Sequence, residues 1–466
     1  MSSILIKGGT VISATGALDA DVLVAGEKVV AVIARAVRGA VEPQVDEVID
    51  ARGKYVLPGG IDVHTHMEMP FGGTFSADTF ETGTIAAAFG GTTTIVDFAV
   101  QAKGTSLLAT LDKWHEKADG NCAIDYGFHM IVSDVNDTTL KEMDACIGNG
   151  VTSFKMFMAY PGVFYATDGE ILLAMQKAAG NGALIMMHAE NGIAIDQLAA
   201  QALGRGETDP VYHGLTRPPE LEGEATSRAI QLAKVTGCPL YIVHLSASQA
   251  LAAVAEARDN GQNVFAETCP QYLYLTLDDL ARPGFEGAKY VCSPPLRPRE
   301  HGAALWRGLR TNDLSVVSTD HCPFCFKGQK ELGVGDFSKI PNGIPAVEHR
   351  MDLLHQGVVN EEITLARWVE ISATTPARLF GLYPRKGTIA AGSDADIVIY
   401  DPAARQVLSA ATHHMNVDYS AFEGMEITGR VATTMSRGRV IVDGGAFTGS
   451  AGYGTFLSRD LNQYLI

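Results

Sequence analysis

The sequence has 466 residues, of which 46% are hydrophobic and 19% are charged, and its formal net charge is -17. This composition is that of a globular protein with ample core, which excludes a chain dominated by disorder. The acidic surplus leaves no basic face for phosphate backbones and so excludes nucleic acid as a partner. No signal-peptide pattern opens the chain and no apolar run reaches the length of a membrane span, so we expect a cytoplasmic protein without a membrane partner.

The seven cysteines are an odd number spread over the whole chain, which predicts reduced thiols rather than a disulfide framework. Cys322 and Cys325 form the only CxxC motif. We interpret this motif as two thiols in a loop, because a structural zinc site would need a second pair of ligands.

Short alternating strands are predicted near both ends of the chain. They cover residues 4–6, 10–12, 22–24 and 29–32 near the beginning, and residues 395–400, 429–434 and 440–442 near the end. Because the same pattern returns after a long, different segment, we expect both ends to form one small discontinuous β-domain. Its two parts are placed at residues 1–57 and 385–448, and a tail follows at residues 449–466.

The segment between these parts, residues 58–384, alternates short β-branched runs with amphipathic stretches rich in Ala and Leu. This pattern is typical of repeated βα units around a parallel sheet. Eight strands are predicted, near residues 61–66, 92–98, 124–131, 151–158, 183–188, 239–244, 262–268 and 315–320. Eight is the number that closes a (β/α)8 TIM barrel, so the fold class is α/β. The gap at residues 270–314 predicts a long loop that is irregular at 292–298 and serves the active site.

Residue types that bind metals fall at the ends of these predicted strands. A TIM barrel carries its active site at the C-terminal ends of its strands, so residues far apart in sequence converge there. His64 and His66 are two positions apart and therefore point to the same side of their strand. A single histidine after an apolar run is more often a core residue, so the prediction of a metal site rests on the combination of His64, His66, His188, His244 and Asp320.

Lys155 lies inside the fourth predicted strand between Phe154 and Met156. Burying an ammonium there costs several kcal/mol unless it is paired or neutralised. Burial lowers the pKa of a lysine, and a neutral amine can react with carbon dioxide to give a carbamate that would bridge two metals. The residues alone leave two alternatives open: this carboxylated lysine, or an ion pair with Asp97 or Glu267.

Six motifs occur in the order found in one known family: PGGIDVHTH at residues 58–66, FKMFMAY at 154–160, MHAEN at 187–191, VHLS at 243–246, TDHCPF at 319–324 and IPNG at 340–343. Together they resemble the microbial D-hydantoinases and dihydropyrimidinases of the amidohydrolase superfamily. The resemblance extends from about residue 3 to residue 460. It implies a (β/α)8 TIM barrel with a β-sandwich domain formed by both chain ends.

The same resemblance implies the composition of the active site. Two Zn2+ ions per subunit, which Mn2+ or Co2+ could replace, are bridged by Lys155 carboxylated to N6-carboxylysine with carbon dioxide. His64, His66 and Asp320 hold one ion, and His188 and His244 hold the other. The substrate-binding residues implied are Tyr160, then Ser293 and Asn342 through backbone groups, and the apolar residues Met69, Phe71, Phe157 and Phe164.

The activity that the resemblance implies is hydrolytic ring opening of cyclic ureides, namely 5,6-dihydropyrimidines and hydantoins, to N-carbamoyl amino acids. A hydroxide shared by the two metals attacks the ring, Tyr160 donates to the developing oxyanion, and Asp320 transfers the proton. The resemblance also implies a homotetramer in which the tail reaches a neighbouring subunit.

Two alternatives remain in the sequence. A dihydroorotase or allantoinase would use the same metals, but dihydroorotases resemble HxHxR, and the arginine position holds Glu68 here. A carboxylated substrate is therefore disfavoured, the more so if Glu68 faces the pocket. Some relatives are non-catalytic scaffold proteins that have lost ligands, whereas all six ligands remain in this chain.

Overall fold

The computed structural model describes residues 2–35 and 43–463. Residues 1 and 36–42 of the predicted N-terminal part and residues 464–466 of the predicted tail lie outside the described residues. No helix within the described residues is long and apolar enough to cross a membrane.

Eight parallel strands form one sheet in chain order. They are β7 (Gly60–Thr65), β10 (Thr92–Val100), β11 (Asp125–Ile131), β12 (Ser153–Phe157), β13 (Leu184–His188), β14 (Leu240–Ile242), β15 (Val264–Thr268) and β16 (Val316–Val317). Seven of them are entirely buried and β10 is buried but for its last residue, as expected for a parallel sheet covered on both faces. All eight predicted strands are therefore present, and the predicted barrel is confirmed.

The sheet is nearly closed between its first and last strands. Thr319 Oγ1 donates to Asp62 Oδ2 at 2.6 Å, and the amide of His66 donates to the carbonyl oxygen of His321 at 2.8 Å. The eighth strand is shorter than predicted. It ends early because Val317 pairs with Thr268, the last residue of β15, so the neighbouring strand offers no further partner.

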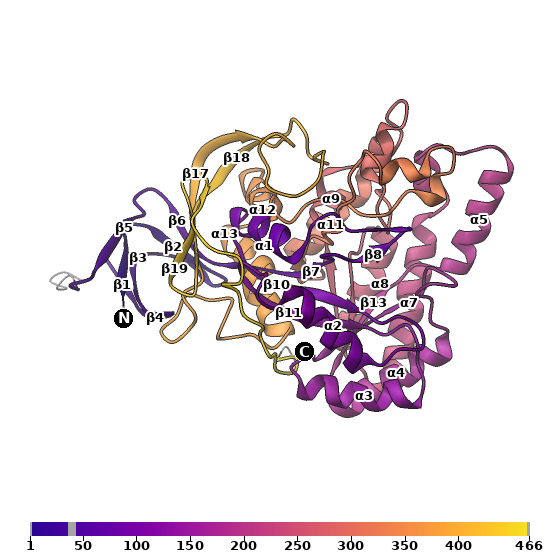
Figure 1. Cartoon of the computed structure of the whole chain (residues 1–466), viewed down its shortest axis with the longest axis horizontal. Coiled ribbons are helices and arrows are strands. Elements are labelled where there is room, and N and C mark those ends of the chain that lie inside the picture. The colour runs from indigo at the N-terminus through magenta and orange to yellow at the C-terminus, as the bar shows by residue number, and fades with distance from the viewer. Residues whose placement is uncertain (1, 36–42, 464–466) are drawn as a thin grey trace.

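Helices surround this sheet in Figure 1. Several begin at a residue whose side chain accepts backbone N–H groups of the first turn, such as Ser106, Asn136 and Thr167. The helices of eight or more residues are α1 (Phe80–Phe89), α2 (Leu107–Ala118), α3 (Asp137–Gly148), α4 (Asp168–Asn181), α5 (Gly192–Gly204), α7 (Pro219–Thr236), α8 (Ser248–Asp259), α11 (Arg299–Thr311) and α12 (Arg350–Val359).

The gap before the last barrel strand is only partly irregular. Residues 291–298 lack regular structure, as predicted, but short helices precede them. The short helical segments of the chain are α6 (Val211–Leu215), α9 (Pro270–Tyr274), α10 (Leu277–Leu280), η1 (Glu286–Tyr290), η2 (Lys330–Gly333), η3 (Phe337–Lys339), α13 (Leu365–Val369), η4 (Glu370–Thr374) and α14 (Thr375–Leu379).

A second, ten-stranded sheet contains strands from both chain ends, the indigo and yellow arrows beside the barrel in Figure 1. Its strands are β1 (Ser3–Lys7), β2 (Thr10–Ser13), β3 (Gly16–Ala25), β4 (Lys28–Ala34), β5 (Glu47–Asp50), β6 (Tyr55–Pro58), β17 (Ile397–Val407), β18 (Glu426–Ser436), β19 (Arg439–Asp443) and β20 (Ala446–Phe447). β6 joins the halves, pairing in parallel with β2 and antiparallel with β17. The two chain ends therefore share one sheet, as the sequence predicted. The remaining strands, β8 (Pro70–Phe71) and β9 (Thr74–Phe75), form a small hairpin.

A buried ion network joins the barrel to the β-domain. The ammonium of Lys386 lies 2.6 Å from Asp125 at the start of β11 and 2.5 Å from Asp396 beside β17. Asp394 completes a cluster of three buried carboxylates around this lysine. Because Arg437 also pairs with Asp125, and Arg385 and Lys28 pair with Asp394, these carboxylates are already paired without a metal.

The described part of the tail lies against its own barrel, at the end where the strands begin. The amide of Leu457 donates to the carbonyl oxygen of Tyr126, and the guanidinium of Arg459 is buried and donates to Ser153 Oγ at 2.9 Å. These contacts stabilise the barrel within one chain. The contact of the tail with a neighbouring subunit stays a prediction.

Candidate active site

The predicted metal-binding residues meet at the C-terminal end of the barrel. His188 is the last residue of β13, His66 directly follows β7, and Lys155 is the central residue of β12. His244 and Asp320 follow β14 and β16 after two and three residues, respectively. His64 lies within β7, and its side chain and these five are all buried.

Two of these residues and the neighbouring Tyr160 have unusual backbones. The φ angles are 40° for His244, 51° for Asp320 and 60° for Tyr160, in the left-handed region that non-glycine residues rarely adopt. Such conformations cost about 1–3 kcal/mol each and cluster at functional sites, where the surrounding structure enforces them. The fold therefore holds these three side chains at some cost to stability.

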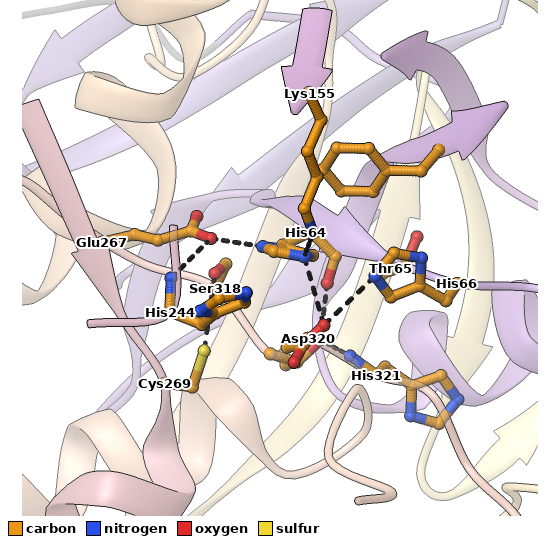
Figure 2. A network of polar contacts seen from close by, with 12 residues as sticks. His64, Thr65, His66, Lys155, His244, Glu267, Cys269, Ser318, Asp320 and His321 are labelled. Atoms are coloured by element: carbon orange, nitrogen blue, oxygen red, sulfur yellow. Dashed lines mark hydrogen bonds and ion pairs between the residues drawn. The ribbon is translucent and has the colours of Figure 1, made fainter. Parts of the chain in front are cut away.

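Asp320 is the centre of the cluster shown in Figure 2. Its Oδ1 lies 3.1 Å from Nε2 of His64 and 3.2 Å from Nε2 of His66. Nζ of Lys155 lies 2.8 Å from the same Nε2 of His64. The ligand atoms of His64, His244 and Asp320 lie within 4.8 Å of one another. Separations of this size are those between ligand atoms of one metal ion or of two adjacent ions, whose bonds to nitrogen or oxygen are about 2 Å long.

Two glutamates orient the histidines. Glu267 at the end of β15 accepts a hydrogen bond from Nδ1 of His64, as well as bonds from the amide of His244 and the hydroxyl of Tyr241. Since a carboxylate only accepts, Nδ1 of His64 carries a proton, which leaves Nε2 as the atom that faces Lys155 and Asp320 and could bind a metal. In the same way Glu190, 2.7 Å from Nε2 of His188, leaves the lone pair of that residue on Nδ1.

Lys155 forms no ion pair with any residue that the structure describes, so the predicted alternative of a pair with Asp97 or Glu267 is wrong. The Asp97 carboxylate instead accepts hydrogen bonds from Thr65 Oγ1 and the backbone amide of Met67, both at 2.8 Å. Burial lowers the pKa of Lys155 to about 8. About a tenth of its amine is therefore neutral and nucleophilic at pH 7, far more than for an exposed lysine.

The donor set fits divalent metal ions. Burial lowers the pKa of His66 to about 3, so its imidazole is neutral, as a metal ligand must be. Nδ1 of His66 and Nδ1 of His244 are buried and have no hydrogen-bond partner in the described structure. Four imidazoles and a carboxylate that converge in a buried space supply the nitrogen and oxygen ligands that Zn2+ and similar ions prefer.

A cavity opens above this cluster, and every predicted substrate-binding residue lines it. Its wall contains His66, Lys155, His188, His244 and Asp320 together with Met69, Phe71, Phe157, Tyr160, Phe164, Ser293, Asn342 and Cys322. The side-chain amide nitrogen of Asn342, Nδ2, donates to the Tyr160 hydroxyl at 3.3 Å and to Ser293 Oγ at 3.1 Å. The three predicted polar contacts are therefore linked to one another by side-chain hydrogen bonds.

Glu68 does not face this cavity, so it supplies no repulsion against a carboxylated substrate. Its Oε1 accepts a hydrogen bond from the amide of Phe80 at the start of α1. Lys117 donates to its backbone carbonyl oxygen at 3.1 Å. A carboxylate at a helix N-terminus is stabilised by the free N–H groups there, which explains why the Glu68 side chain points towards α1.

The comparisons with known proteins agree with this geometry. A family model described as the amidohydrolase family matches residues 55–441. The D-hydantoinase of Streptomyces coelicolor is 67% identical over 464 residues, which cover 100% of this chain and 99% of that protein. The chain belongs to the D-hydantoinase and dihydropyrimidinase family. Another D-hydantoinase of this family, from Geobacillus stearothermophilus, is 53% identical over 98% of this chain and 96% of that protein.

Solved structures of the D-hydantoinase and dihydropyrimidinase family share the fold over the whole chain. The crystal structure of dihydropyrimidinase from Brevibacillus agri superposes with a TM-score of 0.96 at 52% identity, covering 98% of this chain and 99% of that one. The family resemblance and the fold class inferred from the motifs are therefore confirmed.

The roles of Glu190 and Glu267 were missed by sequence reasoning. The sequence indicates Glu267 only as an alternative partner for Lys155, and Glu190 only as part of a motif. A signal was available, since Glu190 follows His188 by two positions and Glu267 lies near the end of a barrel strand, where side chains converge on the site.

Proposed function

We propose that this chain is a cyclic amidohydrolase that opens the ring of hydantoins and 5,6-dihydropyrimidines to N-carbamoyl amino acids. One observation carries the proposal: a single cavity joins the buried histidine and aspartate cluster to an apolar wall and to the linked polar groups of Tyr160, Ser293 and Asn342. Relatives named D-hydantoinase, 53% and 67% identical over nearly the whole chain, support the same activity.

The residues at the cavity floor would hold two divalent cations, with Zn2+ the first candidate and Mn2+ or Co2+ possible replacements. His64, His66 and Asp320 would bind one ion, and His188 and His244 the other. Such a pair, when bound, supplies an activated water and polarises the carbonyl group of the ring. Asp320 is the only negative ligand among these five, which leaves most of the charge of two such ions unbalanced.

Lys155 would supply the missing negative charge. Its neutral amine adds to carbon dioxide and loses one proton, which converts the lysine to N6-carboxylysine, an anion with two oxygen ligands. The position of Nζ, 2.8 Å from His64 Nε2, supports this role, because a carboxylate built on that nitrogen would reach the space that the histidines surround.

Tyr160 would stabilise the negative charge that develops on the substrate carbonyl oxygen, and Asp320 would transfer the proton. Burial raises the pKa of the Tyr160 phenol, so the hydroxyl stays protonated. Since Asn342 donates to the Tyr160 oxygen, the phenol proton is free to bind the carbonyl oxygen of the substrate as it gains charge. Asp320 would accept a proton from the attacking water at a carboxylate oxygen and then deliver it to the departing ring nitrogen.

The remaining wall favours neutral ureides. Met69, Phe71, Phe157 and Phe164 are apolar, and an apolar wall cannot compensate the desolvation of a substrate carboxylate. The arginine of the HxHxR pattern is absent, which argues against dihydroorotate, and all six ligands are present, which argues against a non-catalytic scaffold. We expect the enzyme to be a cytoplasmic homotetramer.

Steady-state kinetics of the zinc-loaded enzyme tests this proposal. We expect measurable kcat/KM on hydantoin, dihydrouracil and hydantoins with apolar 5-substituents, and much weaker turnover of dihydroorotate and allantoin. The Asp320→Ala variant serves as the control for contaminating hydrolases. A kcat/KM on dihydroorotate or allantoin that equals or exceeds the others would overturn the substrate assignment, and no ureide turnover at all would overturn the activity.

A further inference from the structure

Lys330 is a fully buried lysine that the proposed mechanism does not use. It begins η2, and no carboxylate among the described residues pairs with it. Its ammonium instead donates to three backbone carbonyl oxygens, those of Val291 at 2.9 Å, Pro341 at 2.7 Å and Gly343 at 2.9 Å. A lysine ammonium has three N–H donors, so these three bonds use all of them.

The three carbonyl groups belong to the two loops that carry the polar substrate contacts. Pro341 and Gly343 flank Asn342 directly, and Val291 precedes Ser293 by two residues. Neither loop forms a helix or a strand at these positions. The amide of Gly343 also donates to the carbonyl oxygen of Val291 at 2.9 Å, so Lys330 lies at the junction of the two loops.

The hydrogen bond from Lys330 to the Pro341 carbonyl oxygen determines the direction of the backbone N–H of Asn342. In a trans peptide the C=O and the following N–H point in opposite directions, and the Pro341–Asn342 peptide is trans. Because the Pro341 carbonyl points to Lys330, the Asn342 N–H points away from it. No described residue accepts a hydrogen bond from this N–H, although Asn342 lines the cavity.

The carbonyl group of Ser293 is free in the same way. The carbonyls on either side of it are taken, since Cys292 accepts from His213 Nε2 and Pro294 accepts from the Tyr272 hydroxyl, both at 2.8 Å. No described residue donates to the Ser293 carbonyl oxygen. A cyclic ureide carries ring N–H donors beside carbonyl acceptors, the chemical complement of one free acceptor and one free donor.

We propose that Lys330 is a positioning residue for substrate recognition, whose ammonium fixes the Asn342 N–H and the neighbouring Ser293 loop so that they present a donor and an acceptor to the ureide ring. This inference rests on the proposed function. The cost of burying this amino group supports it: burial lowers the pKa of Lys330 to about 7, a penalty on the charged form that a neutral apolar side chain would avoid in the same space.

The Lys330→Met variant tests this role, since it keeps an unbranched side chain only one atom shorter and removes the charge and all three donors. We expect KM for hydantoin to rise about tenfold, as for the loss of one or two neutral hydrogen bonds. The inhibition constant of 2-imidazolidinone, a cyclic urea without the attacked acyl carbon, should rise by the same factor. The kcat should stay within about threefold and the metal content should not change, because the bonds serve binding in ground and transition states alike.

Lys327→Met is the matched control, because Lys327 is three residues away and exposed. It should leave both constants unchanged. Lys330→Gln keeps two N–H donors without the charge and should give intermediate constants. If the wild-type enzyme hydrolyses no ureide, the proposed function fails, while inhibitor binding measured by calorimetry still tests Lys330.

Three outcomes would overturn the proposal. The first is a folded, metal-loaded Lys330→Met variant with unchanged KM and unchanged inhibitor binding. The second is a loss of kcat with KM unchanged, which would place Lys330 in the chemical step. The third is that neither Lys330 variant folds while the control does, which would assign the lysine to the stability of the fold alone.

Discussion

Glu267 accepts a hydrogen bond from Nδ1 of His64 in the buried floor of the active site, so Nε2 of this histidine faces Lys155 and Asp320. The two residues lie 203 positions apart in the sequence, at the ends of the first and seventh barrel strands. A carboxylate in this position fixes both the tautomer and the ring orientation of a metal ligand.

The Glu267→Gln variant should therefore bind metal more weakly. An amide can donate to Nδ1 as well as accept from it, so the His64 tautomer is no longer fixed, and losses of about 10–100-fold in metal affinity are typical. Competition with a chromogenic chelator measures the affinity. Glu256→Gln, an exposed glutamate on α8, is the control. Equal metal affinity in both variants would contradict the role assigned to Glu267.

The Lys155→Ala variant should lose metal and activity together, because it removes the anion that would balance two cations. Elemental analysis of the purified variant and turnover of hydantoin measure the two losses. Added acetate or propionate should restore part of both by supplying a carboxylate in the space left by the side chain. Two ions per chain with normal turnover would show that Lys155 does not bridge the metals.

The Asp320→Asn variant should separate proton transfer from metal binding. The amide oxygen can still act as a ligand, but it cannot carry the proton, so kcat should fall by at least about 100-fold. Metal content, measured on the same sample, should fall far less. Retention of full kcat would refute proton transfer by Asp320.

The Asp352→Asn variant should change the pH dependence of stability. Asp352 lies on α12, where it accepts a hydrogen bond from Gln406 at 2.8 Å near Glu348 and Arg430, and burial raises its pKa to about 7. The folded state therefore holds this proton more tightly than the unfolded state, whose aspartate pKa is about 3.9. The stability that this proton contributes is complete below about pH 4 and is lost as the pH rises towards 7.

Asparagine resembles the protonated acid at every pH, so this loss is absent from the variant. The Tm of Asp352→Asn relative to wild type should rise between pH 5 and pH 8, by an amount equivalent to at most roughly 3 kcal/mol. Calorimetry at both pH values measures it, with the exposed Asp259→Asn as control. A Tm difference that is the same at both pH values would contradict the assignment.

The sequence predicts the strands and the convergence of the candidate ligands well because both follow local rules. A buried parallel strand is a short apolar run, and its last residues point into the barrel mouth, so His188 could be placed without a structure. The bonds of Lys330 and the tail contact of Arg459 could not be predicted. Both side chains meet backbone carbonyls, and any residue can provide a carbonyl, so the sequence carries no sign of which residues they contact.

The irregular loops show the same limit. The sequence identifies residues 292–298 as irregular because of their prolines, but the direction of Glu68 depends on a helix that begins twelve residues later. Periodicity is a property of a single element, and it does not report how two elements lie against each other.

The pairing of β6 with β17 has a consequence for synthesis on the ribosome. β6 ends at Pro58 and β17 begins at Ile397, so the N-terminal strands emerge with the whole barrel still to be translated. Until then β6 exposes an unpaired edge, which is where nascent chains associate wrongly. Completion of the β-domain therefore has to wait for residue 397 and those that follow it, and a chaperone that shields β6 during elongation should raise the yield of folded enzyme.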